Sequence, residues 1–135
     1  MTKPVRLLVV LAAVLSFALA GSALVQAAVA VSISPRAKLV ANGAVQLVVE
    51  ASCDPGAVVL EAHVSVSQDN QSISGQAGIP VQCDGESRRY RVTVSPLEGA
   101  FHTGDAFASA FVLTCPDASC ETTEQGQDFG TIRVQ

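Results

Sequence analysis

The chain of 135 residues contains no tryptophan, one tyrosine and only two histidines, His63 and His102. Histidine is the most common general base and a frequent metal ligand, so few side chains are available for either role. Without tryptophan the chain lacks the exposed aromatic platform on which sugars usually stack. These shortages argue against an enzyme, a metal centre and a carbohydrate site, and we expect no cofactor.

Basic residues are also few. Beyond residue 27 the chain has six lysines and arginines against twelve aspartates and glutamates, a formal net charge of −6. Nucleic acid is therefore not expected as a partner, because phosphate binding needs a clustered positive surface. The cluster Arg88, Arg89 and Arg91 is small. We interpret it as a solvated strand edge that discourages pairing with other sheets.

Long hydrophobic stretches are absent except near the N-terminus. Lys3 and Arg6 precede the largely apolar stretch Leu7–Ala20, and small residues follow it. This three-part order is typical of a secretory signal peptide. The fourteen residues of the stretch are fewer than the roughly twenty that a membrane-spanning helix needs, which disfavours an uncleaved anchor.

The predicted signal peptide has two candidate cleavage positions, after Ala27 and after Ala30, because small or modest residues precede both. We favour Ala27. The sequence then predicts a signal peptide over residues 1–27 and one domain over residues 28–135. The mature protein is expected to be secreted into the extracellular space, with no stable membrane insertion after cleavage.

Four cysteines all follow the predicted signal peptide. In an exported chain they indicate two disulfides, and they lack the paired C-x-x-C spacing of a zinc site. Three pairings are possible. We favour Cys53 with Cys83 and Cys115 with Cys120, because only four residues separate the last two, a natural closed turn.

Beyond residue 28 the hydrophobic pattern has a period of two rather than 3.6, which indicates strands. Along Val45–Cys53, for example, apolar and polar side chains alternate and the cysteine shares the apolar side. Comparable alternation occurs in Val29–Ser34, Leu60–Ser67, Ile79–Cys83, Arg89–Val94, Phe107–Cys115 and Ile132–Val134. Turn-forming pairs such as Asn42-Gly43 and Asp84-Gly85 separate these stretches.

About seven short strands in roughly one hundred residues predict an all-β fold. The most suitable architecture is an Ig-like two-sheet antiparallel β-sandwich with two disulfides. A small open or closed barrel is the alternative, since strand number and patterning do not separate the two.

The alternation also predicts which side chains of Phe107–Cys115 face the core. Phe107 and Phe111 share one side of this stretch with Leu113 and Cys115, whereas alanines occupy the other. Because cysteines of a disulfide are usually buried, we expect the phenylalanine side to be the core. The other side, with Ala106, Ala108 and Ala110, would then be a shallow outer surface.

The C-terminal third resembles the neocarzinostatin-type chromoproteins. The matching features are Leu97–Gly104, then Phe107 and Phe111, then the closed C-x4-C loop from Cys115 to Cys120. The resemblance implies a small, acidic, exported actinobacterial sandwich of seven strands that holds an apolar ligand in a cleft. In that family the second disulfide also closes a short loop, whereas Cys53 and Cys83 are thirty residues apart.

Four residues are candidates for a ligand site: Phe101, His102, Phe107 and Phe111. His102 lies between glycines near Thr103. The three phenylalanines, with Phe129 as a further candidate, would line a cleft for an apolar small molecule. His63 falls on the polar side of its stretch, so we expect it to be solvated.

The sequence is thus interpreted as an exported, non-enzymatic binding or interaction module whose partner is an unknown protein or apolar small molecule. A carrier of an apolar molecule is the first alternative. The second is an inhibitor of an exported protease, because the loop from Cys115 to Cys120 is preorganised and its Cys-Pro segment resembles the reactive loop of subtilisin-inhibitor-like proteins.

Overall fold

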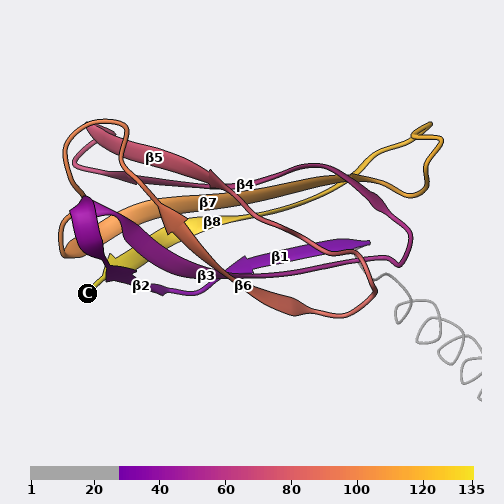
Figure 1. Cartoon of the computed structure of the whole chain (residues 1–135), viewed down its shortest axis with the longest axis horizontal. Helices are drawn as coiled ribbons and strands as arrows, with labels where there is room; N and C mark the ends of the chain where they lie inside the picture. The colour runs from indigo at the N-terminus through magenta and orange to yellow at the C-terminus, as the bar shows by residue number, and fades with distance from the viewer. Residues whose placement is uncertain (1–27) are drawn as a thin grey trace, which may run out of the picture.

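The computed structural model describes residues 28–135, and the predicted signal peptide lies outside the described residues (Figure 1). The described chain consists of strands joined by turns, with one short 3-10 turn at Ala41–Gly43. The strands are β1 (Val29–Ile33), β2 (Arg36–Leu39), β3 (Val45–Cys53), β4 (Val58–Gln68), β5 (Ile73–Gly78), β6 (Arg88–Val94), β7 (Gly104–Cys115) and β8 (Glu124–Val134). The prediction of an all-β fold is confirmed.

Hydrogen bonds connect the strands in the order β1-β3-β2-β8-β7-β4-β5, and β6 pairs with the free side of β3. Neighbouring strands are antiparallel except β2 and β8, which run parallel. Strand β2 therefore joins two groups, β1-β3-β6 and β8-β7-β4-β5. Figure 1 shows these groups running lengthwise through the molecule.

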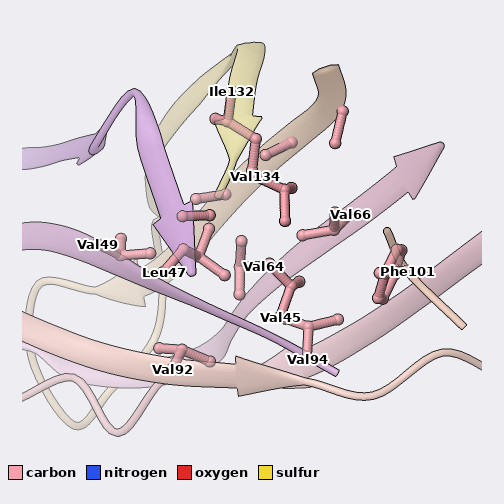
Figure 2. Close-up of a cluster of buried hydrophobic side chains, with 14 of the residues drawn as sticks. Val45, Leu47, Val49, Val64, Val66, Val92, Val94, Phe101, Ile132 and Val134 are labelled. Carbon is pink, nitrogen blue, oxygen red and sulfur yellow. The ribbon is translucent and has the colours of Figure 1, made fainter. Parts of the chain in front are cut away.

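The core lies between the two groups, and valine is its most frequent residue (Figure 2). Strands β3 and β6 contribute Val45, Leu47, Val49, Val92 and Val94 from one side. From the other side come Val64, Val66, Ala106, Ala108, Ala110, Ile132 and Val134. The alternation along β3 and β6 thus predicted their buried side chains correctly, because period-two patterning places every second residue on one face.

The two groups approach closely where β1 passes β8. A side chain on Gly126 would place its Cβ 2.9 Å from Val29 Cγ1 and 3.0 Å from the Val29 carbonyl oxygen. Asp128, two residues further on, accepts a hydrogen bond of 2.7 Å from the backbone N–H of Ile33. The glycine therefore makes room for β1, and the aspartate fixes it in place.

Both predicted disulfides are present: Cys53–Cys83 and Cys115–Cys120. Cys53 ends β3 and is buried, as its position on the apolar side indicated. The strand predicted over Ile79–Cys83 is wrong, because this segment is non-regular. Pro80 lacks a backbone N–H for a sheet ladder, and the N–H of Val81 donates to the Ile79 carbonyl oxygen at 2.8 Å.

The predicted orientation of β7 is also wrong. Ala106, Ala108 and Ala110 are buried in the core, whereas Phe107 is 49% exposed. Thr114, on the alanine side, is fully buried beside Cys115, so the burial of the cysteine does not mark the inner side of the strand. Alanines fit here because the facing valines of β3 and β6 already fill the space between the groups.

Candidate binding face

Two phenylalanines lie next to each other on the outer surface of the group β8-β7-β4-β5. Phe107 of β7 is 49% exposed and Phe129 of β8 is 64% exposed. Their ring centroids are 6.4 Å apart, within the range of interacting aromatic pairs. Large exposed apolar side chains on neighbouring strands are a feature of surfaces that contact other molecules.

The neighbours of these rings follow from the strand register. Phe107 lies opposite Ser67 of β4 and Thr131 of β8. One step further along β7, Ser109 lies opposite Ser65 and Phe129. Uncharged polar side chains thus lie directly opposite the two rings, and the ion pair of Asp105 and Arg133 lies one residue pair further on the same side. We call this surface the Phe107 face. It comprises Ser65, Ser67, Gln71, Ser74, Gln76, Phe107, Ser109, Phe129 and Thr131.

A second aromatic contact continues the surface along β7. Phe111 lies opposite His63, and the centroids of the two rings are 5.7 Å apart. The Nδ1 atom of His63 lies 3.1 Å from a carboxylate oxygen of Glu61. Both rings are partly buried, so they leave less apolar surface open to a partner than Phe107 and Phe129 do.

Two hollows flank Phe107. One, of about 490 Å³, is also lined by Asp69, Asp105 and Thr131. The other, of about 350 Å³, is lined by Ser74, Gly75 and Leu97 among others. Ser67, Gln71 and Phe107 border both, so Phe107 separates two parts of one concave region. Each hollow is large enough for a side chain or a small-molecule fragment.

The rim of the larger hollow is anchored by Gln68, the last residue of β4. Its side chain is almost fully buried and donates from Nε2 to the carbonyl oxygen of His102 at 2.8 Å and of Asp105 at 3.3 Å. Its Oε1 accepts the backbone N–H of His102 at 2.9 Å. The amide thus satisfies backbone groups of the β6–β7 loop and holds that loop against the β4–β5 turn.

The β4–β5 turn has an uncommon backbone conformation. Asp69, Asn70 and Gln71 all have positive φ, at 54°, 55° and 70°. Residues other than glycine rarely adopt this region, and three in succession persist only where neighbouring contacts hold them in it. The bond from Ser72 N–H to the Asp69 carbonyl, at 3.2 Å, is one such contact. All three residues line the larger hollow.

His102 makes the second contact between the turn and the loop. Its Nε2 lies 2.9 Å from Asp69 Oδ2, and its Nδ1 lies 2.9 Å from the carbonyl oxygen of Thr103. The Thr103 carbonyl, followed by the Asp69 carboxylate, raises the pKa of the His102 imidazole above its ordinary value. In the protonated form both ring nitrogens donate, so protonation strengthens this contact.

The four ligand candidates from the sequence are not gathered in one cleft. Phe101 is 2% exposed and belongs to the core. His102 lies in the exposed loop, whereas Phe107 and Phe111 lie on the outer surface. Phe129, a further candidate for the predicted cleft, lies beside Phe107 on the outer surface. Its place opposite Ser109 depends on the β7–β8 register, which the sequence does not specify.

Within residues 28–135 no group of three or more His, Cys, Asp or Glu side chains is arranged to hold a metal ion. In the part of the chain that the structure describes, no helix is long and apolar enough to cross a membrane. Comparisons with models of protein families, with curated proteins and with solved structures found no match.

Proposed function

We propose that the protein is an exported, non-enzymatic binding module with an Ig-like sandwich fold, and that it binds another protein through the Phe107 face. The observation that carries the proposal is the exposed pair Phe107 and Phe129 beside a concave surface whose lining is mostly polar and includes the carboxylates of Asp69 and Asp105. Aromatic side chains are enriched at the centres of protein interfaces, and polar side chains form the rim around them.

The strand pairing supports an Ig-like arrangement. β3 pairs with β6, while β4, β7 and β8 are neighbours, which matches the B–E and C–F–G pairings of Ig domains. The disulfide Cys53–Cys83 differs from the Ig pattern, since it joins the end of β3 to the segment before β6. Two disulfides also favour an oxidising compartment outside the cytosol.

The surroundings of His102 support a role other than catalysis. Asp69 and the Thr103 carbonyl each lie 2.9 Å from one of its ring nitrogens. When the imidazole is protonated, both N–H groups donate to these acceptors, and neither nitrogen has a lone pair that could remove a proton from a substrate. His102 is therefore better suited to fastening the loop.

A carrier of an apolar small molecule is the second candidate. It is favoured by the two hollows that share Phe107, Ser67 and Gln71, because a flat ligand could lie across the ring and contact hydroxyl and amide groups on both sides. Such a ligand would bind on the outer surface of the sheet, because Phe101, the alanines of β7 and the valines fill the interior.

Capture from the native culture medium tests the proposal. The protein, purified after expression of the full chain, serves as bait beside a Phe107→Ala/Phe129→Ala variant and a Leu60→Ala variant. Leu60 is a suitable surface control, because its side chain is 51% exposed, like that of Phe107, and lies at the β-bulge of β4, away from Phe107. Mass spectrometry of bound proteins and of extracted small molecules separates the two candidates. A protein retained by the wild type and by Leu60→Ala, but lost from the double variant, is the expected result.

A further inference from the structure

The six basic side chains of residues 28–135 fall into two sets. Arg88 is paired with Asp84, and Arg133 is paired with Asp105 at 3.1 Å. The remaining four make no ion pair with any part of the described chain: Arg36, Lys38, Arg89 and Arg91. Four unpaired cations are unexpected in a domain that has twice as many acidic as basic residues.

These four side chains gather on the outer surface of β2, β3 and β6, the side of the molecule opposite the Phe107 face. Arg36 and Lys38 are exposed on β2, and Arg89 and Arg91 are exposed on β6. β3 lies between them, since Lys38 is opposite Gln46 and Arg91 is opposite Val48. Because neighbouring strands are about 4.8 Å apart, the β2 and β6 backbones are separated by only about 10 Å. We call this surface the basic face.

Three adjoining hollows run along the basic face. Arg36, Lys38 and Arg91 line one of about 330 Å³. Arg89 and Arg91 line a second, of about 470 Å³, and Arg89 also borders a third, of about 250 Å³. Each hollow shares an arginine with the next, so the cations follow an elongated path rather than surrounding a single pocket.

Glu50 is the one acidic side chain that lines these hollows, and it accepts a hydrogen bond of 2.7 Å from the Ser87 hydroxyl. The basic face therefore keeps an excess of positive charge. Glu50 lies opposite Arg89 in the β3–β6 register. One carboxylate against four cations leaves a net positive charge that an anionic ligand would neutralise.

We propose that the basic face binds an extended polymer of repeated phosphate groups other than a nucleic acid, since no aromatic side chain on which a base could stack lines its hollows. Three of the four cations are arginines, whose planar guanidinium groups bind phosphate oxygens in pairs. Arg89 and Arg91 lie on the same side of β6, so their Cα atoms are about 6.6–6.8 Å apart. That spacing presents successive cations to successive anionic groups of a chain.

A polymer fits this surface better than a lipid bilayer does. The large exposed hydrophobic side chains of the described residues are Val58, Leu60, Leu97, Phe107 and Phe129. None of them lines the hollows of the basic face. Peripheral membrane binding combines basic side chains with apolar ones that enter the headgroup region, and the basic face provides only the first of these.

Calorimetric titration with medium-chain inorganic polyphosphate at low salt tests the proposal on the purified protein. The variants are Arg89→Gln and Arg91→Gln, and the matched controls are Arg88→Gln and Arg133→Gln, whose side chains are already paired. We expect each of the first two to weaken binding roughly tenfold, since a hydrogen bond to a charged group is lost. Each of these two substitutions should also reduce, by about one, the steepness with which the logarithm of the binding constant falls with the logarithm of the salt concentration. The controls should bind within about twofold of the wild type.

The proposal is overturned if polyphosphate does not bind, or if the controls lose as much affinity as the variants. Stronger binding to vesicles of phosphatidylglycerol than to polyphosphate would make the surface a membrane site instead. Equal binding of polyglutamate would remove the preference for phosphate. If a variant fails to fold, NMR of the unsubstituted protein tests the same proposal. On addition of polyphosphate the side-chain Nε–H signals of Arg89 and Arg91 should shift, while that of Arg88 should not. Unshifted Arg89 and Arg91 signals would overturn the proposal.

Discussion

The side-chain amide of Gln68 binds both backbone polar groups of His102, with its oxygen 2.9 Å from the amide nitrogen and its nitrogen 2.8 Å from the carbonyl oxygen. Through this contact the end of β4 and the β6–β7 loop form one rigid edge of the larger hollow. The shape of that hollow thus depends on the buried side chain of Gln68 as well as on the exposed ring of Phe107.

Replacing Gln68 by alanine should lower the free energy of unfolding by about 1–3 kcal/mol, because buried backbone groups of the loop lose their partners. Gln76→Ala is the control, since Gln76 is exposed on β5 and should change stability by less than about 0.5 kcal/mol. Denaturant unfolding measures both. Equal stability of the two variants would mean that the Gln68 contacts are not formed in solution.

The contact between His102 and Asp69 should make stability depend on pH. Because the folded-state pKa of His102 is raised above its ordinary value, the stabilisation is fully present at low pH, below the unfolded-state pKa. It is lost as pH rises through the folded-state pKa. NMR titration should show the His102 pKa falling in Asp69→Asn, which keeps the side chain's shape. An unchanged pKa in that variant would contradict the contact.

The two disulfides should contribute unequally. Cys53–Cys83 closes the longer loop and should stabilise by about 4 kcal/mol in the chain-entropy model, against about 2 kcal/mol for Cys115–Cys120. Cys53 is also buried in contact with Val29 and Val112, so its replacement loses packing as well. Urea unfolding of the two paired Cys→Ala variants should therefore give a larger loss for Cys53 and Cys83. Similar losses would show that loop length does not determine how much each disulfide stabilises the protein.

The structure of β1 favours one of the two predicted cleavage positions. Val29 is buried and pairs with Cys53 at the start of β1. Cleavage after Ala30 would remove this residue, whereas cleavage after Ala27 leaves β1 intact. N-terminal sequencing of the exported product should begin at Ala28. A product that begins at Val31 would contradict this preference, and one that retains Met1 would contradict export.

The sequence predicted those parts of the fold that local patterning determines. The bounds of β3 and its buried side chains follow from an alternation that only Val48 interrupts, and Cys115–Cys120 follows from a four-residue spacing. β2 and β5 were not predicted. β2 is only four residues long, and the two glycines of β5, Gly75 and Gly78, weaken its pattern.

The candidate site was predicted less well, because alternation separates two faces of a strand without showing which one is buried. On β7 the larger side chains face outward, since valines of β3 and β6 occupy the space opposite the alanines. The Phe107–Phe129 pair and the basic face each combine residues from different strands. Such groupings follow from register and pairing, which one sequence does not specify.

The most direct test of the account is to measure stability and binding on the same variants. Phe107→Ala should reduce the free energy of unfolding by only about 1 kcal/mol, because the ring is half exposed, and should abolish capture of the partner. Phe101→Ala, in the core, should cost about 3–5 kcal/mol and leave capture intact wherever the variant is folded. A Phe107→Ala protein that loses as much stability as Phe101→Ala, or that captures the partner as well as the wild type, would contradict the assignment of the Phe107 face as the binding surface.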